Sequence, residues 1–298
     1  MVLACTTADA FVQQTSKESV DTHTQLGMTA ANANDLKEAE RHFAAAASLA
    51  PSDPSTRNNY GAILMRLGRI AEARAQFEAS LKLNPDQPSA LTNLAQIYFD
   101  SEQVDDLRMA RTLLERARKN SSDSEIDRAL LVTCLKLGQT LRDKGRFNEA
   151  ITELKSALDP ANPDSVVTQI YATLAEVYEA SGQFENAIPA MRLAVQRDPQ
   201  NEAYQFRYGL LLTDSHAPAA GIIRLQEALK QFPNSARLWL ALGIAQFTRG
   251  QNVESENSFK QSLALDAKMV PHLRILVSHT LSEASTRKPS TSTTRRSL

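Results

Sequence analysis

The chain has 298 residues, of which 42% are hydrophobic, and this length and composition exclude a mostly disordered protein. Its 33 basic and 34 acidic residues nearly balance. The chain therefore lacks the cationic surplus that nucleic-acid phosphates or an anionic membrane surface require, and nucleic acid is not an expected partner. No stretch reaches the roughly 18 consecutive apolar residues of a membrane-spanning helix, so no transmembrane segment is predicted.

Residues 1–19 precede the repeats and contain one short motif. The segment from Val2 to Cys5 resembles the lipobox at which bacterial lipoproteins are cleaved and acylated on cysteine. Only four residues precede Cys5, whereas a lipoprotein signal has a charged start and an apolar stretch before the box. Read from Met1 as given, the chain is predicted to be cytoplasmic. With a true start upstream, Cys5 would be lipidated and would anchor a periplasm-facing envelope lipoprotein through the polar tether 6–19.

A 34-residue period organises residues 20–269. It is visible in residue pairs 34 positions apart, which are Gly27 and Gly61, Ala39 and Ala73, Phe43 and Phe77, Pro51 and Pro85, Gly209 and Gly243, Leu225 and Phe259, and Leu229 and Leu263. A small residue recurs along the chain at intervals of 34 to 40 residues, at Ala39, Ala73, Ala110, Ala150, Ala187, Gly221 and Ser255. We therefore expect seven repeats, over about residues 20–53, 54–87, 88–124, 131–164, 168–201, 202–235 and 236–269.

Each repeat is predicted to consist of two amphipathic helices joined by a short polar turn. The turn glycines, which follow apolar-periodic runs and can take positive φ at a helix end, are Gly68, Gly145, Gly182 and Gly250. Small residues such as Gly61 and Ala73 let the paired helices approach, while Leu64 and Phe77 fill the space between them. Because one helix pair leaves an apolar face open, the pairs are expected to stack.

Extra residues interrupt the period in the middle of the chain. Three are placed between Asp100 and Met109, in the turn of the third repeat, and six follow Leu114 within the polar run 119–124. Three more surround Pro160 and Pro163. Because small, charged and proline residues favour loops over helices, we expect these insertions to be loops.

The landmarks of two repeats carry a family resemblance. The last repeat has Trp239, Leu242, Gly243 and Phe259, and the fifth has Tyr171, Leu174, Tyr178, Ala187 and Pro199. This pattern resembles the tetratricopeptide signature of Trp, two residues, Leu-Gly, two residues and Tyr, followed by Ala, three residues, Phe, and then Pro. The resemblance implies an all-α fold, a right-handed α-solenoid, that acts as a non-enzymatic scaffold for a protein or peptide partner and uses no cofactor.

In tetratricopeptide proteins the first helix of each pair lines a concave groove. The positions that this resemblance assigns to the groove are Asn58, Asn59, Arg66, Asn93, Gln96, Lys136, Gln139, Arg142, Gln169, Thr173, Glu176 and Arg207. Asn and Gln offer both donors and acceptors, which suits the backbone of an extended peptide or a bound helix. The alternative is that these side chains are merely solvated.

One specialised groove is not expected. Chaperone-binding members of the family clamp a terminal carboxylate with Lys and Asn in one repeat, Asn in the next, and Lys and Arg in the third. Asn59 matches the middle element, but the flanking positions, Thr24, Met28, Ser89 and Asn93, supply no positive charge. The sequence therefore predicts no such clamp at this register.

The sequence lacks the common catalytic and metal-binding motifs. The chain has no GxSxG, HExxH or phosphate-loop motif, and its five histidines, His23, His42, His216, His272 and His279, are scattered over different repeats. Cys5 and Cys134 lie far apart, so neither a disulfide nor a zinc site is expected. We expect no enzyme and no metal. A regulatory subunit, whose catalytic partner is another chain, remains an alternative.

The end of the chain is predicted to close the array. Leu273, Leu276, Val277 and Leu281 share one face of a predicted capping helix over 270–284. Residues 285–298 are basic and rich in Ser and Thr, which predicts a disordered tail.

Overall fold

The computed structural model describes residues 19–159, 162 and 164–266. Over these residues the chain is all-α, with fourteen helices and no strand, and the predicted α-solenoid is confirmed. None of the described helices is long and apolar enough to cross a membrane. Residues 1–18 with Cys5, the predicted capping helix and the tail lie outside the described residues. The chain divides into two compact units, residues 1–146 and 147–298, and each is described by itself.

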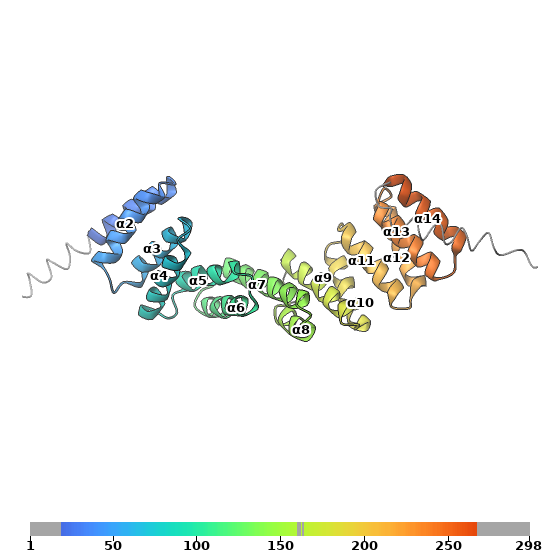
Figure 1. Cartoon of the computed structure of the whole chain (residues 1–298), viewed down its shortest axis with the longest axis horizontal. Coiled ribbons are helices and arrows are strands. Elements are labelled where there is room, and N and C mark those ends of the chain that lie inside the picture. Colours follow the sequence, from blue (N-terminus) through green and yellow to red (C-terminus); the bar gives the residue numbers. More distant parts are fainter. Residues whose placement is uncertain (1–18, 160–161, 163, 267–298) are drawn as a thin grey trace, which may run out of the picture. The chain divides into compact units, whose positions relative to one another are not determined.

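The first unit consists of stacked helix pairs (Figure 1). Residues 19–32 are helical and are followed by α2 (Leu36–Leu49), α3 (Pro54–Arg66), α4 (Ile70–Leu83), α5 (Pro88–Asp100), α6 (Val104–Lys119) and α7 (Ser124–Asp143). Proline stands at the start of α3 and α5, where its missing N–H costs nothing. Helices α3 and α4 pack together, as do α5 and α6.

The second unit continues the same pattern. Its helices are α8 (Phe147–Ser156), α9 (Ser165–Ala180), α10 (Phe184–Arg197), α11 (Glu202–Asp214), α12 (Pro218–Gln231), α13 (Ala236–Thr248) and α14 (Asn252–Leu265). Helices α9 and α10, α11 and α12, and α13 and α14 form packed pairs (Figure 1). The buried side chains of α12 and α13 form one apolar cluster, which joins successive pairs.

The turn within each pair contains one residue with positive φ. Four of these residues are the glycines at 68, 145, 182 and 250, with φ between 72° and 82°, as predicted. The equivalent positions in three other turns hold Asn34 (φ 59°), Glu102 (φ 61°) and His216 (φ 64°). These three were not predicted, because the prediction relied on glycine and each of them carries a side chain.

Small and large residues interlock between paired helices, as expected. A Cβ atom added to Gly61 of α3 would lie 2.7 Å from the ring of Phe77 in α4. Phe77 is itself completely buried. The approach of α3 to α4 therefore requires glycine at this position, and substitution would force one of the two helices to shift.

The insertions differ from their predicted form. The turn after α5 spans residues 101–103 and the loop after α6 spans 120–123, the same lengths as 67–69 and 84–87 in the preceding repeat. The extra residues are helical instead, because α6 has 16 residues against 14 in α4, and α7 has 20 against 13 in α5. A turn and a loop do occur at these two places, but the prediction that the extra residues lie in them was wrong.

Two features explain why the second insertion is helical. The side chain of Asp123 caps α7 by accepting a hydrogen bond from the backbone N–H of Glu125 (3.0 Å). Ile126 is then buried in the core of the first unit, and Ala129 and Leu130 pack against it. The apolar contacts of these residues thus favour helix despite the polar composition of the preceding run.

In the second unit, α9 begins at Ser165, three residues before the predicted repeat start at 168.

Candidate protein-binding surfaces

The first unit contains eight of the twelve predicted groove residues. Asn58, Asn59 and Arg66 lie on α3, Asn93 and Gln96 on α5, and Lys136, Gln139 and Arg142 on α7. Three of them occupy equivalent positions, because Asn59, Asn93 and Lys136 each lie nine residues before the positive-φ residue of their own turn. The structure therefore places these three side chains at the same position of successive first helices.

Two of these amides hold neighbouring repeats together. The Nδ2 group of Asn93 donates a hydrogen bond to Oδ1 of Asn58 (3.0 Å), and this bond joins α5 to α3. Asn58 is buried. Its side chain therefore contributes to the stacking of the repeats and offers little surface to a partner.

Two predicted cations bind the preceding turn rather than facing a ligand. Arg66 donates to the carbonyl of Ala31 and to Oδ1 of Asn34, both at 3.2 Å. Lys136 donates to the carbonyl of Phe99 (3.2 Å) and lies 3.3 Å from the carboxylate of Glu102 and 4.3 Å from the centre of the Phe99 ring. A cation at a helix C-terminus compensates the exposed carbonyls. These charges therefore stabilise the array.

The remaining groove residues of this unit fall into two groups. Gln96 donates to Asp100 (2.8 Å) and Arg142 to Asp143 (3.0 Å), each within its own helix or at its end. Asn59 and Gln139 are half-buried and have no hydrogen-bond partner within the described residues. Their amides are available to a bound chain.

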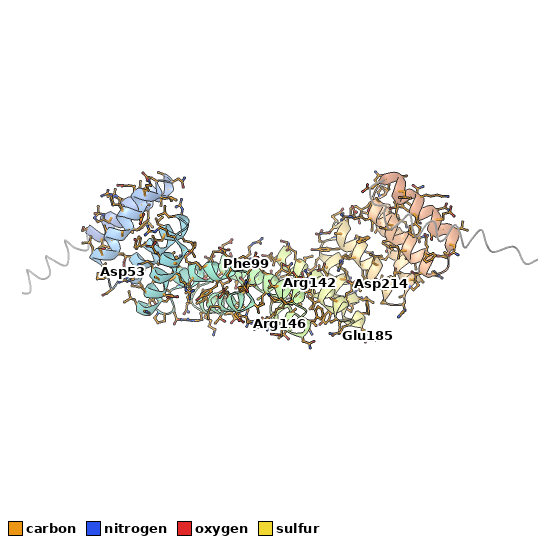
Figure 2. All side chains as sticks on the ribbon, viewed as in Figure 1. Asp53, Phe99, Arg142, Arg146, Glu185 and Asp214 are labelled. Atoms are coloured by element: carbon orange, nitrogen blue, oxygen red, sulfur yellow. The ribbon has the colours of Figure 1, made fainter. Side chains whose placement is uncertain are left out.

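A cavity of about 230 Å³ lies between α5, α6 and α7. It is lined by Thr92, Ala95, Gln96, Phe99, Leu114, Glu125, Arg128, Ala129, Val132 and Thr133, and we call it the α5–α7 pocket. Ala95 and Leu114 are buried, Phe99 and Val132 are half-buried, and Gln96, Glu125 and Arg128 are exposed. Phe99, near the end of α5, is labelled in Figure 2. An apolar interior surrounded by a few polar groups is the usual composition of a binding pocket.

Sequence reasoning identified only Gln96 among the residues of this pocket. Glu125, Arg128 and Ala129 come from the first turns of α7, which the sequence placed outside the repeats. The helical period of Ile126, Ala129 and Leu130 was the signal that could have found them.

The second unit contains Gln169, Thr173 and Glu176 on α9 and Arg207 on α11. Nη2 of Arg207 lies 3.2 Å from a carboxylate oxygen of Glu179 and 3.7 Å from one of Glu176. Glu179 was not among the predicted groove residues. Burial raises the pKa of Glu179, and the charges of Asp214 and Glu176 raise it further, whereas Arg207 lowers it. Arg207 of α11 therefore lies close to two carboxylates of α9.

The histidines are less scattered than predicted. Nδ1 of His23 and Nδ1 of His42 lie 2.9 Å apart, within hydrogen-bond distance, and His42 is buried. The packing of the helix 19–32 against α2 brings them together. In the part of the chain that the structure describes, no group of three or more His, Cys, Asp and Glu side chains could hold a metal ion.

Comparisons with solved structures find helical-repeat proteins. The MamA protein is 22% identical, with a TM-score of 0.46, and the match covers 60% of this chain and 93% of that one. A tetratricopeptide repeat protein from Parabacteroides merdae is 14% identical, with a TM-score of 0.46 and coverage of 89% and 99%. YrrB, described as a TPR protein with an unusual peptide-binding site, is 14% identical, with a TM-score of 0.35 and coverage of 80% and 97%.

Comparison with protein families is more specific. No curated protein matches the chain. A tetratricopeptide repeat model matches residues 24–88, 63–125 and 209–269, and two further tetratricopeptide repeat models match 168–211 and 132–159. These matches cover both units and agree with the paired helices and with the residues that carry the resemblance. The chain therefore belongs to the tetratricopeptide repeat family, whose members act as protein-interaction scaffolds.

Proposed function

We propose that this protein is a non-enzymatic scaffold that holds a partner protein by seating an apolar side chain of that partner in the α5–α7 pocket. The pocket itself is the observation that supports this proposal most. It lies on the first unit, combines an apolar interior with exposed Gln96, Glu125 and Arg128, and measures about 230 Å³. Burying apolar surface there would contribute about 25 cal/mol per Å².

Polar side chains on the first helices of this unit suit a peptide or helix backbone. Asn59 and Gln139 offer unpaired amides, and Gln96 is exposed at the pocket. Lys136 is already paired with Glu102 and with the carbonyl of Phe99. These residues therefore suit an internal segment of the partner, bound through an apolar side chain, better than they suit the partner's terminal carboxylate.

Site-specific photo-crosslinking in native cells tests the proposal. A photoreactive amino acid at Gln96 is expected to capture one defined partner protein, whereas the same group at Thr112, exposed on α6 and outside the pocket, is expected to capture none. Adding Ala129→Trp, which fills the pocket from α7, is expected to abolish capture at position 96. Circular dichroism and thermal unfolding verify that this variant is folded. Equal capture at both positions, or capture that persists with Ala129→Trp, would contradict the proposal.

The likeness of Val2–Cys5 to a lipobox supports a second candidate, an envelope-assembly scaffold anchored through Cys5. These residues lie outside the described part of the chain. Mass spectrometry of the protein purified from its native cells tests this candidate. A diacylglyceryl group on Cys5 is the expected result for an envelope protein, and an unmodified Cys5 would remove that alternative.

A further inference from the structure

The polar side chains inside the α5–α7 pocket are two threonines. Thr92 is half-buried and Thr133 is buried, and both line the pocket. The hydroxyl of Thr92 donates its hydrogen to the carbonyl of Pro88 (2.9 Å), and that of Thr133 donates to the carbonyl of Ala129 (2.8 Å). A hydroxyl has one hydrogen and two lone pairs. Both oxygens can therefore accept a hydrogen bond from an occupant, but neither can donate one.

The side chains of the pocket that carry donors are exposed instead. Gln96 donates to Asp100 (2.8 Å), and Arg128 already interacts with another group of the protein. Glu125 is also exposed, and its carboxylate can only accept. The buried part of the pocket therefore offers an occupant apolar surface and hydrogen-bond acceptors.

The apolar wall of the pocket includes one aromatic ring. Nζ of Lys136 lies 4.3 Å from the centre of the Phe99 ring and occupies one of its faces. The ring also lines the pocket, so its remaining surface is available to an occupant. Aromatic rings favour edge-to-face or offset contact with one another. An aromatic occupant would therefore gain a specific contact here, in addition to burial against Leu114 and Val132.

The size of the pocket favours two fused rings over one. An apolar cavity of about 150 Å³ is large enough to hold benzene. The α5–α7 pocket measures about 230 Å³, so a single ring would leave part of it unfilled. An indole ring fills more of this space, and unfilled space loses packing contacts.

Tryptophan is the side chain that combines these properties. Its Nε1–H group is a donor and not an acceptor, whereas phenylalanine has no donor and tyrosine has a single ring. The chain's only tryptophan, Trp239, is already engaged, because its Nε1–H donates to the carbonyl of Pro233 (3.0 Å) and its ring packs on the apolar cluster of α12 and α13. The occupant is therefore expected to come from another protein.

We propose that the α5–α7 pocket selects a tryptophan side chain of the partner protein. The indole packs against Phe99, and its Nε1–H donates a hydrogen bond to a hydroxyl oxygen of Thr92 or Thr133. This inference rests on the proposed scaffold function and names the side chain that the pocket holds.

Fluorine NMR with the full chain tests this inference. The tryptophan probe is N-acetyl-5-fluorotryptophan amide, whose neutral caps imitate an internal residue of a protein. Its 1-methyl analogue keeps both rings but lacks the N–H, and N-acetyl-4-fluorophenylalanine amide has one ring. The tryptophan probe is expected to bind about fivefold more tightly than its 1-methyl analogue, and about tenfold more tightly than the phenylalanine probe.

A double variant locates the hydrogen bond. Changing Thr92→Val and Thr133→Val together removes both hydroxyls with little change of shape, and is expected to abolish the preference for the tryptophan probe over its 1-methyl analogue. The matched control is Thr112→Val with Thr152→Val, since these exposed threonines also donate to the carbonyl four residues earlier and lie outside the pocket. This control is expected to keep the preference. Circular dichroism verifies that both double variants are folded.

Three results would overturn the inference, and two of them need no threonine variant. Equal binding of the 1-methyl analogue to the unmodified chain would show that the N–H is not recognised. Tighter binding of 5-fluoroindole than of the tryptophan probe would assign the pocket to a small molecule. Binding of the tryptophan probe that persists with Ala129→Trp, which fills the pocket, would place the site elsewhere.

Crosslinking at Gln96 separates this inference from the scaffold function. Capture of a partner at Gln96, together with equal binding of the tryptophan probe and its 1-methyl analogue, would leave the scaffold and remove the tryptophan. Selective binding of the tryptophan probe without capture at Gln96 would instead leave a tryptophan pocket and remove the proposed scaffold function.

Discussion

At the scale of single residues, the turn between paired helices imposes one requirement, a residue with positive φ. Glycine meets this requirement at 68, 145, 182 and 250, and the sequence predicted those four positions correctly. Asn34, Glu102 and His216 meet it with a side chain attached. In this left-handed conformation, residues with a side chain are sterically disfavoured relative to glycine, and Asn is the least disfavoured of them.

The first prediction concerns His216. His216→Gly is expected to raise the free energy of unfolding by about 0.5–1 kcal/mol, because relief of the left-handed strain exceeds the extra flexibility of glycine in the unfolded chain. Thermal unfolding followed by circular dichroism measures the effect. Ser215→Gly is the matched control, since Ser215 has φ −78° and its hydroxyl bonds to the carbonyl of Leu212, and it is expected to lower stability. A lower melting temperature for His216→Gly would show that the imidazole makes a compensating contribution.

Side-chain roles were harder to predict than backbone geometry. Arg66 and Lys136 occupy positions assigned to a ligand-facing groove, yet both bind the preceding turn. A sequence shows that a side chain lies on a given helical face, but its hydrogen-bond partner belongs to another repeat and depends on how far the helices are offset. The same limit applies to Asn58, whose buried bond to Asn93 was not foreseen.

At the scale of helices, the main discrepancy is the lengthening of α6 and α7. The polar composition of 119–124 favoured a loop, and residues 120–123 are one. The extra residues beyond it are helical because Asp123 caps α7 and Ile126 joins the core. Glu125, Arg128 and Ala129 from these added turns line the α5–α7 pocket, which is why the sequence did not predict it.

The second prediction tests that cap. Asp123→Ala is expected to destabilise the start of α7 by about 1 kcal/mol and to speed hydrogen exchange in residues 124–130. Asp53→Ala is the matched control, because Asp53 caps α3 through an equivalent bond to Ser55 N–H (3.0 Å). It is expected to speed exchange at the start of α3 and to leave α7 unchanged. An unchanged rate of hydrogen exchange at residues 124–130 in Asp123→Ala would show that packing alone stabilises the first turns of α7.

At the scale of the whole molecule, the sequence predicted the all-α fold, the paired helices and the repeat family. These features depend on spacings that recur along the chain, so each repeat reinforces the prediction from the others. The lining of the α5–α7 pocket depends instead on a departure from the repeat, the long α7. The division into seven repeats, the capping helix over 270–284 and the lipidation of Cys5 stay predictions.

Titration of the partner captured at Gln96 against the purified chain tests the central claim most directly. The chain and its Ala129→Trp variant, verified to be folded, are compared by isothermal titration calorimetry. If the partner's apolar side chain occupies the α5–α7 pocket, Ala129→Trp is expected to raise Kd by about tenfold or more, which corresponds to about 1.4 kcal/mol. An unchanged Kd would contradict the claim that this pocket holds the partner.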